Sequence, residues 1–217
     1  MNKIVIFGAG SLAEMVCFYL ERKTPNCVAG FIVDPEHLLQ DSLMNLPVVS
    51  SENMGSIFPS ASFDMIVAIG YSNMRARALV INRMRDTGYT FKNLIPESGC
   101  DGSINGTNNI IMPGSVVEPF ATIGNDNIIW SGAHICHNAN IQNNNFFATG
   151  SIIGGYTKID NGCFFGFGSI VIENIKVSEE TLVAAGGVVT EDTQAHSQYM
   201  GLPAKISDNH KGTGIIF

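Results

Sequence analysis

The sequence predicts an α/β domain followed by a parallel β-helix of hexapeptide repeats. Two observations carry this prediction. Apolar strands alternate with amphipathic helices over the first 95 residues, and from Ile111 to Val189 every sixth residue is Ile, Val or Phe. The 23 glycines among 217 residues add a third, because many tight turns require them. We therefore expect two domains, residues 1–95 and 96–217.

The first domain shows the alternation of strands and helices most clearly. KIVIF, CVAGFIVD and MIVAIG are apolar enough to be buried strands. SLAEMVCFYLERK is an amphipathic helix that we expect Ser11 to cap, and NMRARALVINRMRDTG is a second helix that we expect to end at Gly88. This order is typical of a small parallel sheet covered by helices.

The six-residue period runs through the second domain without an interruption. Asn and Gly, which tolerate the left-handed backbone of sharp corners, recur in GNDN, QNNN and DNGC. A parallel β-helix explains this pattern, because each unit is one short strand plus one corner, with the apolar residue pointing inward. Three units make one coil, so residues 18 apart stack, and we expect no long loop between residues 111 and 190. The apolar positions are Ile111, Val117, Ile123, Ile129, Ile135, Ile141, Phe147, Ile153, Ile159, Phe165, Val171, Val177, Val183 and Val189.

The segment SGAHICHNAN places His134, Cys136 and His137 on one coil. In the predicted register Ile135 points inward, both histidines lie at the outer surface, and Gly155 stacks beside His137. We expect no metal here, because no other His, Asp or Cys stacks beside the two histidines. Two interpretations stay open at this point. The histidines are simply solvated, or His137 is a general base, since imidazole titrates near neutral pH.

The amino-acid composition limits the classes of partner that the protein can bind and indicates where it is located. The net charge of −7 argues against nucleic acid or an anionic membrane as the partner. The five cysteines include no CxxC pair, which argues for reduced thiols. No apolar run is long enough to span a membrane, and MNKIVIFGAG lacks the features of a secretory signal. We therefore expect a cytoplasmic protein.

Four features together resemble the hexapeptide-repeat acyltransferases of bacterial sugar modification, and in particular two groups. These are the nucleotide-amino-sugar N-acetyltransferases of the bacillosamine and perosamine pathways and the sialic acid O-acetyltransferase-like group. The features are the loop in IVIFGAGSLAEMV, the segment IVAIGYSNMR, the unbroken repeat with its histidine, and the closing GLPAK at residues 201–205. The resemblance covers nearly the whole chain. It implies a Rossmann-like N-terminal domain, a left-handed β-helix, acetyl-CoA as co-substrate without a metal, and a homotrimer with active sites between subunits.

The same resemblance implies roles for individual residues. His137 matches the catalytic base, and Asn138 follows it where the family usually has Glu or Asp. Gly155 matches a glycine whose N–H lies near the thioester. Phe146 stands where the family often has a second histidine near the thioester, and Phe167 and Ala185 match further positions of the coenzyme site. The positions that match the nucleotide-sugar site are Gly10, Ser11, Leu12, Asp34 and Gly70.

These implications predict acetylation of the amino group of a nucleotide-linked sugar, expected to be a 4-amino sugar for bacterial surface glycans, by direct attack. Asn138 favours an amine over a hydroxyl, because an amine needs less help from the base. Sugar or sialic acid O-acetylation and a non-catalytic nucleotide-sugar-binding trimer remain alternatives. GAGSLA with Asp34 would also fit a nicotinamide enzyme, but the first domain is too short for a full dinucleotide fold. A γ-class carbonic anhydrase needs three histidines on one zinc, which this pattern lacks.

Three further expectations concern residues outside these motifs. Trp130 and Phe164 are expected at a trimer interface or over the coil surface. His196 and His210 are expected to be solvated in a loop or tail. Cys136 is a conceivable nucleophile without a matching role in the family.

Overall fold

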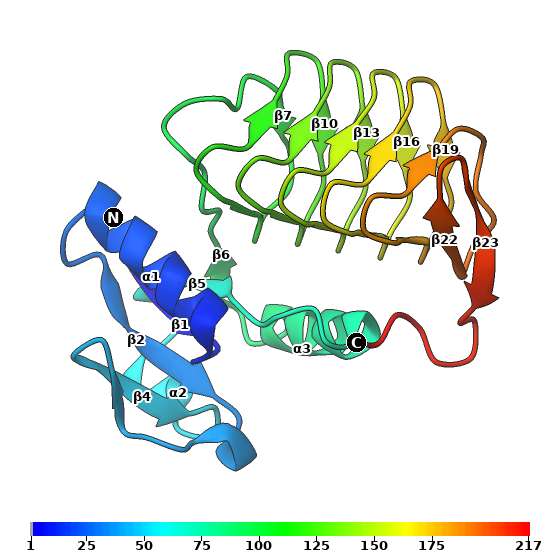
Figure 1. Cartoon of the computed structure of the whole chain (residues 1–217). Helices are drawn as coiled ribbons and strands as arrows, with labels where there is room; N and C mark the ends of the chain where they lie inside the picture. Colours follow the sequence, from blue (N-terminus) through cyan, green and yellow to red (C-terminus); the bar gives the residue numbers. More distant parts are fainter. Residues whose placement is uncertain (1) are drawn as a thin grey trace. The chain divides into compact units, whose positions relative to one another are not determined.

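The computed structural model describes residues 2–217, which form two compact units that we treat separately (Figure 1). The first unit extends to Gly70 and includes Arg77–Leu94. The second comprises Tyr71–Ala76 and Ile95–Phe217. Residues 71–76, which the sequence-based division puts in the first domain, therefore pack with the β-helix unit. Among the described residues, no helix combines the length and apolar character needed to cross a bilayer.

The first unit contains a six-stranded sheet in the order β3-β4-β2-β1-β5-β6. All neighbours pair in parallel except β3 and β4, which are antiparallel. The predicted α/β organisation is thus confirmed. The strands are β1 (Lys3–Phe7), β2 (Val28–Val33), β3 (Ser42–Leu43), β4 (Leu46–Ser50), β5 (Phe63–Val67) and β6 (Thr90–Phe91). The helices are α1 (Ser11–Lys23), α2 (Met54–Ile57), α3 (Met74–Arg85) and the 3-10 turn Pro35–His37.

The turn between β1 and α1 corrects one expectation. Ser11 is the first helical residue, and the N-cap is Gly10, which offers no side chain to the free N–H groups. The cause lies two residues earlier, where Gly8 adopts φ +122° and passes so close to β5 that an added Cβ would lie 2.5 Å from the Ala68 carbonyl oxygen. This tight turn leaves the first N–H groups of α1 without a capping side chain.

The second unit is a parallel β-helix whose strands form three sheets (Figure 1). Within Ile110–Val189 the paired residues are 18 apart, as in Ile135 with Ile153. All fourteen predicted apolar positions lie in one buried core. The strands are β7 (Ser103–Ile104), β8 (Ile110–Ile111), β9 (Val116–Val117), β10 (Thr122–Ile123), β11 (Ile128–Ile129), β12 (His134–Ile135), β13 (Asn140–Ile141), β14 (Phe146–Phe147), β15 (Ile152–Ile153), β16 (Lys158–Ile159), β17 (Phe164–Phe165), β18 (Ile170–Val171), β19 (Lys176–Val177), β20 (Leu182–Val183) and β21 (Val188–Val189).

The first coil begins before the predicted start of the repeat and is irregular. Ile123 pairs with Ile104, which lies 19 residues earlier rather than 18. One extra residue between Ile104 and Ile111 therefore breaks the six-residue count, which is why the period is not visible before Ile111.

Each corner of the coil contains one residue with a left-handed backbone, and these residues form three columns. The first column is all glycine: Gly114, Gly132, Gly150, Gly168 and Gly186. The second is Phe120, Asn138, Tyr156 and Asn174, and the third is Asn108, Asp126, Asn144, Gly162 and Glu180. The expectation that Asn and Gly mark the corners holds at most positions, and Phe120, Tyr156 and Glu180 are the bulkier exceptions.

Asparagine side chains connect successive coils beside the third column. The Asn127 and Asn145 N–H groups donate to the amide oxygens 18 residues earlier, at 2.9 and 3.0 Å, and Cys163 N–H donates to Asn145 at 2.7 Å. Asn127 and Asn145 are fully buried. Buried corner N–H groups need an acceptor, and a stacked amide supplies one at these three successive positions.

The C-terminal region closes the β-helix with a hairpin of β22 (Ser197–Gly201) and β23 (Ala204–Asn209). The GLPAK segment spans the turn of this hairpin. The last residues then pair with the 71–76 segment. Met74 N–H donates to Ile215 at 3.1 Å, and Phe217 N–H donates to Ser72 at 2.9 Å. The tail thus holds this segment on the β-helix unit.

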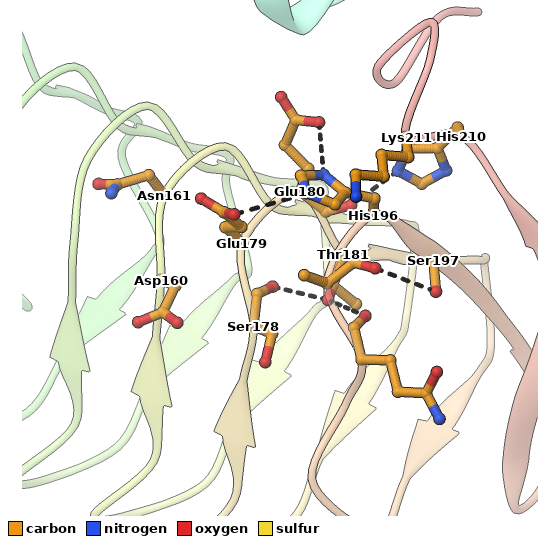
Figure 2. A network of polar contacts seen from close by, with 12 residues as sticks. Asp160, Asn161, Ser178, Glu179, Glu180, Thr181, His196, Ser197, His210 and Lys211 are labelled. Carbon is orange, nitrogen blue, oxygen red and sulfur yellow. Dashed lines mark hydrogen bonds and ion pairs between the residues drawn. The ribbon is translucent and has the colours of Figure 1, made fainter.

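A polar network anchors the start of this tail (Figure 2). Arg75 donates from two nitrogens to the Glu180 carboxylate at 2.8 and 2.7 Å. His196 Nδ1 lies 3.0 Å from the same carboxylate, and His210 Nε2 lies 2.7 Å from the Glu180 carbonyl oxygen. The expectation that His196 and His210 are merely solvated was wrong, because both hold Glu180.

The first prediction concerns Glu180. The hydrogen bonds from Arg75, together with that from His196, outweigh partial burial and hold the pKa of Glu180 below its ordinary value of 4.5. Its stabilising effect is therefore complete above that value and is lost as the pH falls through the lower pKa of the folded state. Glu180→Gln should lower the melting temperature near neutral pH, and the gap from wild type should narrow below about pH 4.

Thermal unfolding followed by circular dichroism across this pH range checks the prediction. Glu191→Gln is the control, since Glu191 is 78% exposed and lies 3.7 Å from Lys205. Exposed pairs of this kind contribute little. A wild-type-like melting temperature for Glu180→Gln at neutral pH would contradict the assignment.

The second prediction concerns Phe120, which has φ +67° and is 75% exposed. A left-handed backbone costs a residue with a Cβ about 1–2 kcal/mol, and asparagine tolerates it better. Phe120→Asn should raise the free energy of unfolding by about 1 kcal/mol, as measured by urea denaturation. Phe120→Ala, which keeps the Cβ, should change it much less. Equal effects of the two substitutions would show that strain at this corner is not the cause.

Candidate active site

His137 lies at a corner of the β-helix directly after β12. Ile135 is fully buried and fixes the strand, so the chain turns outward over the next residues, and Asn138 adopts φ +59°. The exposed imidazole lies over Gly155 of the next coil, as the 18-residue register predicts. A Cβ added to Gly155 would lie 3.0 Å from Cε1 and 3.2 Å from Nε2 of His137. Only a glycine leaves this space beside the ring.

Asn138 determines the tautomer of His137. The His137 Nδ1 atom lies 3.1 Å from the Asn138 amide oxygen. An amide oxygen can only accept, so Nδ1 carries the proton and Nε2 keeps its lone pair. Tyr156 of the next coil packs edge-on against the ring, with centroids 5.4 Å apart. The arrangement presents Nε2 as a hydrogen-bond acceptor above Gly155.

Gly155 supplies a donor beside this acceptor. Its carbonyl oxygen accepts from Asn174 N–H at 2.9 Å. Its N–H group donates to no acceptor within residues 2–217. A free backbone N–H next to a basic nitrogen can bind an oxygen that gains negative charge.

Glu118, which sequence reasoning missed, reaches the same corner from the preceding coil. One carboxylate oxygen lies 2.7 Å from His134 Nε2, and the other accepts from the His137 N–H at 2.7 Å. The hydrogen bonds from His134 and from the His137 backbone hold the pKa of Glu118 below its ordinary value. Glu118 stacks beside Cys136, 18 residues on. The expectation that no His, Asp or Cys stacks beside the two histidines does not cover glutamate, and Glu118 is the stacked carboxylate.

The possible ligand atoms of Glu118, His134 and Cys136 all lie within 4.8 Å of one another. Both carboxylate oxygens are already hydrogen-bonded, and burial, helped by Glu118, raises the pKa of the Cys136 thiol. A protonated thiol is a poor ligand and a poor nucleophile. The hydrogen bonds account for the cluster, and we assign it neither a metal nor a covalent role.

The other predicted coenzyme positions lie elsewhere on the coil. Phe167 is 64% exposed and Ala185 is exposed, and they precede Gly168 and Gly186 of the all-glycine column. His137 precedes Asn138 of a different column. Phe167 and Ala185 therefore lie at a different corner of the coil from His137.

Phe146 is not available to a ligand in this chain. It is 3% exposed and stacks on Phe164 with centroids 4.9 Å apart, while Tyr71 covers it at 4.4 Å. The ring centroids of Phe217 and Phe164 lie 4.4 Å apart. Phe164 therefore lies on the coil surface beneath aromatic residues of its own chain. This is the second of the two positions expected for it, the first being a trimer interface.

The predicted nucleotide-sugar positions lie in the first unit. Gly10, Ser11 and Gly70 are exposed, whereas the Leu12 side chain is buried, which leaves only its backbone to a ligand. The uncapped N–H groups of α1 suit a phosphate.

Asp34 has partners that the sequence did not reveal. It accepts from Ser51 Oγ at 2.8 Å and from Arg83 at 2.7 Å. Partial burial raises the pKa of Asp34, but the hydrogen bonds from Arg83 and Ser51 outweigh it, so the net pKa is below the ordinary value. Asp34 is therefore a fixed carboxylate.

The fold and the site together define a parallel β-helix of hexapeptide repeats, joined to a small α/β unit and with an imidazole at one corner. The family model of the bacterial transferase hexapeptide (six repeats) matches residues 106–137. The second unit is a left-handed β-helix, and these matches support the resemblance to the hexapeptide-repeat sugar acyltransferases seen in the sequence.

Solved structures resemble this chain over nearly its whole length. PerB from Caulobacter crescentus, in complex with CoA and GDP-perosamine, is 26% identical with a TM-score of 0.84, covering 96% of this chain and 98% of that one. A variant of perosamine N-acetyltransferase from the same organism, with the same ligands, is 25% identical with a TM-score of 0.85 and the same coverage.

The acetyltransferase domain of PglB from Neisseria gonorrhoeae is 20% identical, with a TM-score of 0.83 over 95% of this chain and 100% of that one, and supports the fold alone. A search of curated proteins found no match.

The third prediction concerns the contact between Gly155 and His137. In Gly155→Ala the new methyl group would press on the imidazole, which must shift by a few tenths of an ångström. If His137 acts as the base, a small displacement of its ring is costly, so kcat should fall about 10-fold or more while the melting temperature changes little. Gly212→Ala, where an added Cβ meets nothing within 4 Å, is the control. Unchanged kcat in Gly155→Ala would separate this contact from catalysis.

Proposed function

We propose that this protein transfers the acetyl group of acetyl-CoA to the amino group of a nucleotide-linked sugar, with a 4-amino sugar as acceptor and His137 as general base. One observation carries the proposal: the free Nε2 of His137 lies above Gly155, whose N–H has no acceptor among the described residues. The similarity to PerB, solved with CoA and GDP-perosamine, supports this choice of substrates.

The geometry supports direct transfer without an acyl-enzyme. The sugar nitrogen attacks the thioester carbon, a C–N bond forms, and Nε2 of His137 takes the proton that the amine loses. The Gly155 N–H donates to the oxyanion of the tetrahedral intermediate. The C–S bond then breaks, and the imidazolium returns its proton to the departing thiolate. The products are the N-acetyl sugar and CoA, and His137 is again neutral.

The position of the coenzyme residues supports a site between subunits. Phe167 and Ala185 lie at a different corner of the coil from His137, which favours a coenzyme molecule that lies between two copies of the chain. We therefore propose a homotrimer in which acetyl-CoA lies between neighbouring β-helices. The nucleotide phosphates would bind at the N-terminus of α1, beside Gly10 and Ser11. The use of acetyl-CoA favours a cytoplasmic enzyme of bacterial surface glycan synthesis.

The fourth prediction tests this function by thiol release from acetyl-CoA, with UDP-, dTDP- and GDP-linked 4-amino sugars as acceptors. One of them should release CoA at a catalytic rate, and mass spectrometry should show the N-acetyl product. His137→Asn should lower kcat by about 100-fold or more, because general bases contribute about that much. His37→Asn, at an exposed position of the first unit, is the matched control.

The other outcomes distinguish the alternatives. Thiol release only with hydroxyl sugars or sialic acid would replace the proposal with O-acetylation. Binding of a nucleotide sugar without coenzyme A binding or thiol release would identify a non-catalytic protein.

A further inference from the structure

A carboxylate from the preceding coil holds the catalytic corner. Glu118 follows β9 and is partly exposed, with 30% of its side chain accessible. Its two oxygens have different partners, the His134 ring at 2.7 Å and the His137 backbone N–H at 2.7 Å. A single side chain thus joins the two histidines of the segment.

The pattern of coil hydrogen bonds explains why this carboxylate matters for His137. Cys136 N–H donates to Ile153 in the next coil at 2.9 Å, but the following N–H takes no part in this ladder. The equivalent N–H of Gly155 has no acceptor in the described chain, and at the preceding coil the position is Pro119, which has no N–H. Glu118 provides the missing acceptor for His137. The His137 carbonyl oxygen accepts from Tyr156 N–H at 3.2 Å, so both sides of its backbone are held.

The charge of Glu118 complements what Asn138 provides. The Asn138 amide sets the tautomer of His137, but it is neutral and does little to stabilise the imidazolium that forms when Nε2 takes a proton. Glu118 stays ionised, since the hydrogen bond from His134 is the main cause that holds its pKa below the ordinary value. Its negative charge therefore lies beside the backbone of the base.

We propose that Glu118 is the positioning residue for His137, fixing its backbone and supplying from the preceding coil the negative charge that Asn138 lacks. This inference rests on the proposed function, in which His137 is the base. His134 keeps Glu118 in place and does not contact the reacting atoms.

Four groups lie near His137 and bear on the charge of its ring. Glu118 carries a negative charge, and His134 opposes that charge when protonated. Cys136 has a raised pKa and stays a thiol, and Tyr156 packs against the His137 ring. Removal of the Glu118 carboxylate should therefore weaken the stabilisation of the imidazolium that forms during the reaction, because an opposite charge favours the charged ring.

Kinetics on the full-length protein form the first arm of the test. Glu118→Ala should lower kcat about 10- to 100-fold, as expected when a base loses its orientation. The KM for acetyl-CoA should stay within about 2-fold. Glu118→Gln keeps an acceptor for the His137 N–H. Its kcat should therefore lie between that of wild type and that of Glu118→Ala. In Glu118→Gln the acid limb of the kcat/KM profile should move to lower pH.

The control removes the same charge elsewhere on the coil surface. Glu173 is exposed and lies 36 residues after His137, two coils further on. Glu173→Gln should keep the kcat and pH profile of wild type. An equal effect of both substitutions would overturn the proposal in favour of a general surface charge effect.

The second arm does not depend on turnover. NMR without substrates should show a shifted His137 amide resonance in Glu118→Ala, because its acceptor is lost, and an unshifted one in Glu173→Gln. An unchanged His137 amide resonance, or unchanged kcat in a folded Glu118→Ala, would overturn the role of Glu118. If wild type released no thiol but the NMR shifts appeared, the proposed function would fail while the Glu118 contact stood.

Discussion

The parallel pairing of residues 18 apart is the interaction on which the second unit depends. Each strand contributes only two residues, too few to be stable alone. Stacking turns them into long sheets, buries one apolar side chain per strand, and aligns each corner with the next. The same stacking places Gly155 under His137 and Glu118 beside Cys136. The candidate site is thus a property of three successive coils rather than of the segment SGAHICHNAN alone.

The corners limit which side chains the site can use. Position 138 must adopt a left-handed backbone, as positions 120, 156 and 174 do. Asparagine tolerates this conformation and also reaches Nδ1 of His137. One residue therefore meets the backbone requirement and fixes the tautomer, but it brings no charge. The nearest carboxylate comes instead from the previous coil, through Glu118.

The repeat could be read from the sequence because its signal is local and periodic. An inward position every six residues determines the core, the register and the stacking of Gly155 on His137. The partners of Glu118 could be found by the same count, once Glu is admitted beside His, Asp and Cys. The hydrogen bond between Arg83 and Asp34 could not be found in this way, because the two residues lie 49 positions apart in a region without a repeat.

The C-terminal tail shows a second limit. Its pairing with residues 71–76 joins segments more than 100 residues apart, and Phe217 and Tyr71 lie against Phe164 and Phe146. His196 and His210, which follow the last repeat, contact Glu180. No periodic pattern in the sequence marks these contacts. The family resemblance implies a coenzyme position at Phe146, whereas packing by Tyr71 and Phe164 leaves its side chain buried in this chain.

The central claim is that coil stacking presents His137 as a neutral base with a free Nε2. Nitrogen-15 NMR of the imidazole, assigned by comparison with His137→Asn, tests this most directly. We expect a protonated Nδ1 and an unprotonated Nε2 in the neutral ring. A ring protonated at Nε2 would place the lone pair toward Asn138 and would contradict the claim.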